Sequence, residues 1–357
     1  MKINFKYISI FLLIPIIASC SYDLDDIIPM DSGEDVEAPK ISIIYPSEGT
    51  LLRVAEDITS IDINCDVTDD IELKDINIEL DGISIKEQSD FIDYRHSVVK
   101  FNYDNITSGN HILTVIATDL SGKESTSSVS FSKAEPYHSQ FDGEVMYFPF
   151  DGDYTELISI TQADIIGNPA FSTEAKIGNS SYTSTEGSYI SFPADAITAN
   201  KTCTFTFWYK VNAIPDRAGI LILGDDDQGV TQTRTHGFRV FREASGDSQR
   251  IKANVGTGST DVWCDGFLTS SVNPEWVFVA LVIDTNKLNM YYNGELALSS
   301  DLPDNIDWTN CNYLTILNGG PSFSYWNHKY DASLIDDLRG FSKALTIEEI
   351  KSVMDAI

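Results

Sequence analysis

The sequence predicts an all-β protein built from two successive β-sandwiches. Short runs rich in Ile, Val, Thr, Phe and Tyr recur along most of the chain, with apolar residues at every second position. Turn residues separate these runs, and Asn293-Gly294 is the clearest hairpin signal because it tolerates a type I′ turn. Helical patterning is confined to 347–355, which follows the capping-box spacing of Thr346 and Glu349. The 357 residues, 42% of them hydrophobic, suffice for two packed domains.

The N-terminal segment 1–19 is typical of a signal peptide. Lys2 and Lys6 precede an apolar run over 7–17 that is too short to span a bilayer as a helix. Its end, Ile17-Ala18-Ser19-Cys20, resembles the lipobox of bacterial lipoproteins. The resemblance implies cleavage after Ser19 and a lipid anchor on Cys20, and two or three acyl chains would give stable anchoring. The alternative is an ordinary secreted protein in which this cysteine occurs by chance.

Residues 20–37 are predicted to form a flexible acidic tether, because they contain no basic and few apolar residues. Asp23, Asp25 and Asp26 resemble the acidic export signals of lipoproteins displayed on the outer surface of some Gram-negative cells. This implies a lipid-anchored protein of the outer membrane that faces the cell exterior. A tether that is merely solvated would leave the face of the membrane open.

The formal net charge of −30 limits the possible partners. A chain this acidic is repelled by nucleic acids and by anionic lipid headgroups, so we expect no nucleic-acid partner and membrane contact only through the lipid. Neutral glycans, cationic partners and calcium remain compatible.

Residues 38–134 are predicted to form the first sandwich, with strand-like runs over 41–45, 61–67, 76–80 and 111–117. The segment resembles a bacterial immunoglobulin-like module in its entry at 38–47, in 108–115 and in 117–122. Such a module usually spaces or presents another domain. Asp69, Asp70 and Asp119 could gather a calcium ion, or they could satisfy the backbone of turns.

Residues 135–357 are predicted to form the second sandwich, a two-sheet jelly roll with almost no helix. Several segments together resemble the laminin-G-like, concanavalin A-like jelly roll, in family order: 147–152, 178–182, 187–193, 204–210, 275–280, 291–294, 333–339 and 343–346. This family has diverse functions, so the resemblance is more informative about fold than about activity.

The resemblance also implies one structural calcium ion, held by Asp151 and Asp336. Calcium takes six to eight oxygens, so backbone carbonyls and Glu174 or Asp337 would complete its shell. In the alternative, Asp151 caps a turn and Asp336 pairs with Arg339.

The tryptophans fall into two groups. Trp208 and Trp276 lie in apolar strands and are predicted to be packing residues. Trp263, Trp308 and Trp326 lie among polar and turn residues, where an exposed ring could match the apolar face of a sugar. The candidate glycan-binding residues are Trp263, Trp308, Tyr325, Trp326, Arg239 and Asp226. For each ring, packing within a loop is the alternative. Asp225-Asp226-Asp227 with His236 and Arg239 is a second polar cluster or a solvated loop.

Four cysteines follow Cys20. Cys65 is expected to be a buried thiol, and Cys203 has no assigned role. Cys264 and Cys311 flank the loop tryptophans in a compartment that permits disulfides, so they are the candidate disulfide pair. None of the cysteines has the spacing of a zinc site.

No catalytic motif is recognised in the chain: a Glu-x-Asp-x-Glu strand, a nucleophile elbow and a phosphate loop are all missing. We therefore expect a protein that binds carbohydrate without turnover. The layout resembles surface glycan-binding lipoproteins of polysaccharide-uptake systems, which implies an outer-membrane transporter complex as partner. The alternatives are a glycoside hydrolase or lyase accessory on the same fold, and an adhesin or envelope scaffold that binds protein.

Overall fold

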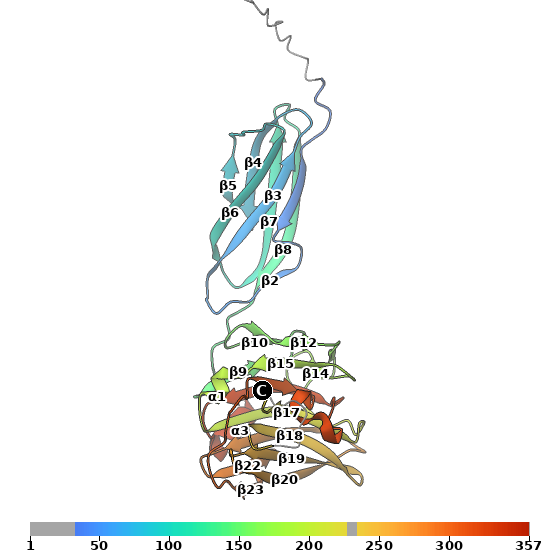
Figure 1. The fold of residues 1–357 in the computed structure, drawn as a ribbon. Helices are drawn as coiled ribbons and strands as arrows, with labels where there is room; N and C mark the ends of the chain where they lie inside the picture. Colours follow the sequence, from blue (N-terminus) through green and yellow to red (C-terminus); the bar gives the residue numbers. More distant parts are fainter. Residues whose placement is uncertain (1–32, 227–233, 357) are drawn as a thin grey trace, which may run out of the picture. The chain divides into compact units, whose positions relative to one another are not determined.

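The computed structural model describes residues 33–226 and 234–356. The described strands pair into two separate sets of sheets, one from residues 40–133 and the other from residues 144–341 (Figure 1). The prediction of an all-β protein is confirmed. The signal peptide, Cys20 and tether residues 20–32 lie outside the described residues, so their predictions stay predictions.

The first sandwich consists of a three-stranded sheet, β1-β3-β6, and a five-stranded sheet, β2-β8-β7-β4-β5. The strands are β1 (Lys40–Tyr45), β2 (Thr50–Leu52), β3 (Thr59–Thr68), β4 (Leu73–Leu80), β5 (Ile83–Gln88), β6 (His96–Ile106), β7 (Gly109–Asp119) and β8 (Glu124–Lys133). In β3 the residues Ile61, Ile63, Cys65 and Val67 are buried while their neighbours are more exposed. This alternation is the period-two pattern seen in the sequence, and Cys65 is a buried free thiol, as predicted.

The acidic residues of the first sandwich hold turns. Asp69 Oδ1 accepts the backbone N–H groups of Ile71 and Glu72, at 2.9 and 2.7 Å. Asp119 Oδ1 accepts the N–H of Lys123 at 2.8 Å and the hydroxyl of Ser121 at 2.9 Å. Both carboxylates thus satisfy turn backbone groups, as the simpler interpretation predicts.

The second sandwich pairs a seven-stranded sheet, β12-β15-β24-β17-β18-β19-β20, with an eight-stranded sheet, β13-β14-β25-β16-β21-β22-β23, to which β9 is added beside β25. Strands β10 and β11 form a separate two-stranded sheet. The strands of the seven-stranded sheet are β12 (Asp164–Ile166), β15 (Tyr189–Pro193), β17 (Arg217–Leu223), β18 (Phe238–Ser245), β19 (Ser248–Gly256), β20 (Asp261–Ser270) and β24 (Tyr313–Ile316). The other strands are β9 (Glu144–Phe148), β10 (Thr155–Glu156), β11 (Thr161–Gln162), β13 (Ala170–Ser172), β14 (Ser181–Thr183), β16 (Cys203–Lys210), β21 (Trp276–Ile283), β22 (Lys287–Tyr292), β23 (Glu295–Asp301) and β25 (Leu334–Phe341).

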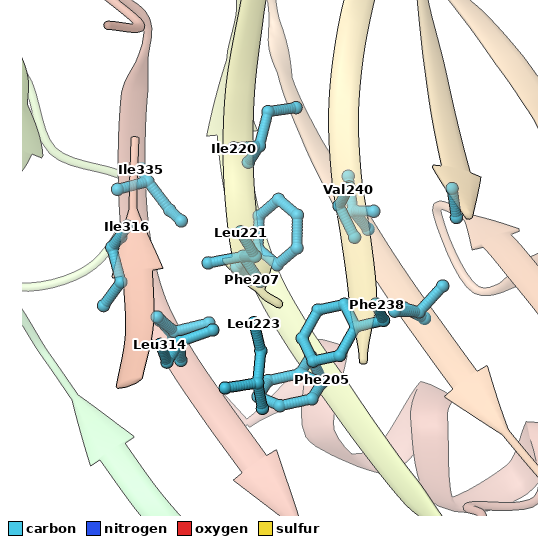
Figure 2. Packing of buried hydrophobic residues seen from close by; sticks show 14 of the residues in the cluster. Phe205, Phe207, Ile220, Leu221, Leu223, Phe238, Val240, Leu314, Ile316 and Ile335 are labelled. Carbon is cyan, nitrogen blue, oxygen red and sulfur yellow. The ribbon is translucent and has the colours of Figure 1, made fainter. Parts of the chain in front are cut away.

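The main core lies between these two sheets (Figure 2). Phe205 and Phe207 of β16 meet aliphatic side chains of β17, β18 and β24, such as Leu221, Val240 and Leu314. All five side chains are at most 1% exposed. Burying a large apolar side chain stabilises a fold by ~1.5–3 kcal/mol, so this layer fixes which face of each strand points inward.

Three short helices and one longer one complete the described fold: α1 (Asp195–Thr198), α2 (Gly320–Phe323), the 3-10 helix η1 (Ser324–Trp326) and α3 (Ile347–Asp355). Helix α3 begins with the predicted capping box between Thr346 and Glu349. Its Ile350 and Val353 pack with Trp208 and Phe278, which confirms Trp208 as a packing residue. No helix in the described part of the chain is long and apolar enough to cross a membrane.

Candidate carbohydrate-binding surface

The candidate site lies on the outer face of the seven-stranded sheet. In β15 and β24, Ile190, Phe192, Leu314 and Ile316 belong to the core between the sheets. The residues next to them in each strand therefore point away from the core, because successive side chains of a strand face opposite sides. This places Tyr189, Ser191, Tyr313 and Thr315 on the outer face.

These outward residues line an open trough with a volume of about 300 Å³. The lining residues are Asp164, Ile166, Tyr189, Ser191, Asp226, Tyr313, Thr315 and Pro321. Three strands, β12, β15 and β24, supply the floor, while the loop after β17 and helix α2 supply Asp226 and Pro321. The trough therefore combines a rigid sheet surface with two loop residues.

The strand register sets the order of groups along the floor. Ser191 lies directly opposite Thr315, and Pro193 lies opposite Tyr313. Tyr189 thus stands at the other end of the floor, displaced from Tyr313 by four residues, or ~13 Å along the strands. Two phenol rings flank a pair of hydroxyls, an order suited to a ligand with apolar faces and polar edges.

Asp226 is held by the turn that precedes β24. Its backbone N–H donates to Asn310 O at 3.0 Å, and its Oδ2 accepts the N–H of Asn312 at 3.0 Å. Partial burial raises the pKa of this carboxyl above its ordinary value. Asp164 is exposed on the edge strand β12, so the trough carries two carboxylates in different environments.

The structure brings three of the predicted glycan-binding residues together, at the opposite end of the same sheet. Trp263 of β20 and Trp326 of η1 have ring centroids 6.4 Å apart, and Tyr325 lies 4.7 Å from Trp326. The rings pack against buried Phe241 and Phe323. We refer to Trp263, Tyr325 and Trp326 as the tryptophan cluster.

A cation covers the rings of this tryptophan cluster. The Arg234 guanidinium carbon lies 5.0 Å from the centroid of Trp263 and 4.6 Å from that of Trp326. The same guanidinium donates to Asp261 Oδ2 at 3.0 Å and to the Tyr325 hydroxyl at 2.6 Å. Arg234 was not among the predicted residues, and it stabilises the cluster where a sugar was expected to stack.

Two predicted glycan-binding residues are wrong because their side chains are buried. Trp308 is 9% exposed, belongs to the core and donates its indole N–H to Asn200 O at 2.6 Å. Arg239 is 1% exposed and donates to His236 O at 2.7 Å, and burial lowers its pKa to about 10. Neither side chain can offer a surface to a ligand.

The predicted polar cluster is divided by the fold. Asp225 Oδ2 lies 2.9 Å from His236 Nδ1, whereas Asp226 lines the trough. Asp227 lies outside the described residues. Asp226 is therefore the one predicted glycan-binding residue that the described structure places in the trough.

The two predicted calcium ligands are engaged by one loop. Asp336 Oδ2 accepts the N–H groups of Lys176 and Ile177, at 2.7 and 3.0 Å. Asp151 Oδ1 accepts that of Asn179 at 2.6 Å. Asp336 Oδ1 is a buried atom with no hydrogen-bond partner among the described residues, and burial raises the pKa of this carboxyl to about 7.

Amide N–H groups therefore occupy one oxygen of each carboxylate, Oδ2 of Asp336 and Oδ1 of Asp151. In the described residues, no three acidic, histidine or cysteine side chains gather around one point. In the part of the chain that the structure describes, Asp151 and Asp336 accept backbone N–H groups and pair with no arginine. It is Asp337 that contacts Arg339, at 2.9 Å. The alternative in which Asp336 pairs with Arg339 is therefore wrong, and calcium stays a prediction.

The predicted disulfide is also wrong, since Cys264 and Cys311 are both free, buried thiols. Cys264 lies inside β20 with its sulfur 3.9 Å from Leu298 O, whereas the Cys311 sulfur lies 3.5 Å from Thr309 O. Burial raises the pKa of Cys311 to about 12, which keeps this thiol protonated.

A larger cavity of about 470 Å³ lies beside the end of β16 and includes the ion pair of Lys210 and Glu174. Its described lining contains no aromatic ring. It therefore lacks the combination of ring faces and polar groups that distinguishes the trough.

The comparisons with known proteins bear on this sandwich. Residues 184–351 match the laminin-G-type family model described as the concanavalin A-like lectin/glucanases superfamily. This part of the chain is a concanavalin A-like jelly-roll domain. The trough and the tryptophan cluster both involve residues of this jelly-roll domain, although Asp164 and Ile166 precede the matched range.

Several solved structures resemble the chain at low identity. Domain 4 of AbnA, a GH43 extracellular arabinanase from Geobacillus stearothermophilus in complex with arabinotriose, has a TM-score of 0.41 and 17% identity. The match covers 59% of this chain and 97% of that domain. The binding domain of botulinum neurotoxin DC in complex with SialylT has a TM-score of 0.43 and 12% identity, covering 60% of this chain and 52% of that one. Similarity at this level carries no information about a ligand. No curated protein sequence matches the chain.

Sequence reasoning missed Tyr189 and Tyr313, the rings that line the trough. Each stands at an outward position beside an inward residue, Ile190 and Leu314 respectively. The available signal was an aromatic residue at a strand position that faces away from the core, where polar residues are usual. Its use required knowing that β15 and β24 are neighbours, although more than 100 residues separate them in sequence.

Proposed function

We propose that the jelly-roll domain binds carbohydrate without turnover, and that the protein is a lipid-anchored lipoprotein facing the exterior of the outer membrane. The observation that carries the binding proposal is the trough itself. Tyr189 and Tyr313 flank Ser191 and Thr315 on the floor, and Asp164 and Asp226 add carboxylates at its edge.

This set of groups suits a sugar. The apolar C–H faces of a pyranose can pack on the exposed part of each tyrosine ring, and Tyr313 is 46% exposed. The hydroxyls of Ser191 and Thr315 donate and accept, while the carboxylates accept hydrogen bonds from sugar hydroxyls. The matched family includes lectins, which also supports the proposal.

Binding is tested with the purified full chain on a glycan array, followed by calorimetric titration of any glycan that binds. Tyr189→Ala and Tyr313→Ala are expected to weaken binding at least tenfold without changing thermal unfolding. Tyr94→Ala is the matched control, because its ring is 52% exposed and belongs to the first sandwich. Binding that survives both trough substitutions would move the site elsewhere, and an array without any signal would contradict the function.

The anchor rests on the lipobox-like sequence ending at Cys20 and on the acidic residues that follow it. Cys20→Ala is expected to move the protein from the membrane fraction to the soluble fraction. Digestion of intact cells with a protease should remove the jelly-roll domain if it faces outward. Co-purification of an outer-membrane transporter with the lipidated protein tests the proposed uptake complex.

A glycoside hydrolase is the second candidate function, and one observation favours it. The trough holds two carboxylates, and partial burial raises the pKa of Asp226, as a general acid requires. Release of reducing ends from a bound glycan, abolished by Asp226→Asn or Asp164→Asn, would establish turnover. Binding with no release of reducing ends or unsaturated products over many hours would support capture alone.

A further inference from the structure

The trough is charged with one sign only. Asp164 and Asp226 are its ionisable carboxylates, and its described lining contains no lysine, arginine or histidine. Asp225, next in the chain, lies 2.9 Å from His236 and does not line the trough. A ligand in this trough therefore meets a negative potential.

Cations nearby are engaged elsewhere on the same face. The Arg239 guanidinium is buried and donates to the backbone carbonyls of His236 and Arg234. Arg234 pairs with Asp261 at 3.0 Å. Lys252 lies 3.0 Å from Asp265 and 3.4 Å from Glu243. Arg234 and Lys252 are thus paired with carboxylates at the tryptophan end of the sheet, whereas Arg239 is buried, donates to backbone carbonyls and does not line the trough.

The consequence for a glycan follows from the chemistry of its substituents. A neutral sugar donates hydroxyl hydrogens to the carboxylates, which can only accept hydrogen bonds when they are ionised and cannot donate them. A uronate or sulfate group has no such proton and would face two like charges at a partly desolvated surface, where repulsion is screened less than in water. We propose that the trough selects neutral glycans and rejects glycans that carry carboxylate or sulfate groups. This inference rests on the proposed carbohydrate function.

The test uses paired glycans with one backbone and two charge states. The pairs are methyl-esterified and unesterified oligogalacturonides, desulfated and sulfated carrageenan oligosaccharides, and desialylated and sialylated glycoprotein glycans. Affinities are measured for every pair of which at least one member binds the full chain. We expect the neutral member to bind about tenfold or more tightly at low ionic strength, which corresponds to ~1.4 kcal/mol. The difference should shrink in 0.5 M salt, because salt screens the repulsion.

Two variants identify the carboxylates as the cause. Asp164→Asn combined with Asp226→Asn should reduce the difference within a pair to less than about threefold. As a control outside the trough, Asp301→Asn removes one carboxylate charge from an 85% exposed side chain on β23 that pairs with Lys287, and it should leave the difference unchanged. If the double variant does not fold, the salt series on the unmodified chain still decides the result.

The possible outcomes distinguish a failure of the charge selection from a failure of the proposed carbohydrate binding. If no glycan of either charge binds, the proposed function fails. If glycans bind but the anionic member of a pair binds as well as the neutral one, the function stands and the charge selection is wrong. Selection that persists unchanged in high salt or in the double variant also contradicts it.

Discussion

The two ends of the seven-stranded sheet use aromatic residues in opposite ways. At the β20 end, Trp263 and Trp326 lie beneath the guanidinium of Arg234 and against buried phenylalanines. At the β12 end, Tyr189 and Tyr313 line an open trough. Aromatic residues on one sheet face therefore do not by themselves mark a binding site. What already covers their rings decides which of them a ligand can reach.

The charges differ between the two ends as well. In the tryptophan cluster Asp261 pairs with Arg234, and the acidic neighbours of Lys252 pair with that lysine. The carboxylates of the trough have no cation among the described lining residues. One end thus has the internal pairing of a packed structure, whereas the other keeps hydrogen-bond acceptors available.

The largest expected effect concerns Trp308, which was predicted to contact a glycan but is a core residue. Trp308→Ala should destabilise the second sandwich by ~3–5 kcal/mol, because it empties a core position and removes the hydrogen bond to Asn200. Urea unfolding followed by near-UV circular dichroism measures this loss. Tyr313→Ala, which truncates a 46% exposed ring, is the control and should cost less than about 1 kcal/mol. Equal losses would place Trp308 at the surface.

The next effect separates the two ends by binding. Tyr313→Ala should weaken glycan affinity by about 30-fold, or ~2 kcal/mol, the cost of a well-placed aromatic anchor. Trp263→Ala should change that affinity less than threefold, since Arg234 already covers this ring. Titration calorimetry with one glycan compares the two variants.

The reverse result, a large loss in Trp263→Ala and none in Tyr313→Ala, would exchange the assignments. It would mean that Arg234 moves aside to admit a ligand at the tryptophan cluster.

Local patterns predicted most of the fold. The alternation around Ile61 to Val67 and the strands rich in phenylalanine place residues by period two, which depends only on neighbours in the chain. The capping box of α3 is equally local. The order of strands in the sheets is not local, since β15 pairs with β24 and β16 with β25 across more than 100 residues. That order was therefore not predicted.

The site was less predictable, for a physical reason. Trp308 and Trp326 have similarly polar neighbours in sequence, yet Trp308 is buried in the core and Trp326 is partly exposed. Burial depends on the path of the 305–330 segment over the sheet, which composition does not determine. Likewise, Asp336 and Asp337 are adjacent, but a bulge in β25 gives Asp337 a φ of 49° and directs its carboxylate to Arg339.

A smaller effect tests whether Arg234, which covers the rings of the tryptophan cluster, stabilises the fold. Arg234→Ala removes two cation–π contacts and the ion pair to Asp261, so we expect a stability loss of ~1 kcal/mol. Asp261 keeps its hydrogen bond from Asn254 at 2.8 Å, which limits the loss. Tryptophan emission should shift to longer wavelength as water reaches the rings, while glycan affinity stays within threefold. A large gain in affinity would show that Arg234 blocks a second binding surface.

The smallest expected effect is the change in protein stability with pH that comes from the ionisation of Asp226. Because burial raises its pKa in the folded protein, the fold binds this proton more tightly than the unfolded chain, whose Asp pKa is about 3.9. The stability that the protonated Asp226 carboxyl contributes is therefore fully present at pH values below its pKa in the unfolded chain. It is lost as the pH rises through the pKa of Asp226 in the folded protein. Asp226→Asn removes that penalty and can still accept the N–H of Asn312 through its amide oxygen.

We thus expect Asp226→Asn to unfold at an equal or slightly higher temperature at pH 7, a gain below about 1 kcal/mol for a half-exposed group, and to match the parent near pH 3. Asp261→Asn in the tryptophan cluster should instead lower stability at pH 7, since its charge is paired with Arg234. Thermal unfolding of both variants across this pH range compares the two ends directly. A loss of stability in both would mean that the Asp226 carboxylate is paired as well, and that the trough is a packed structure and not an open site.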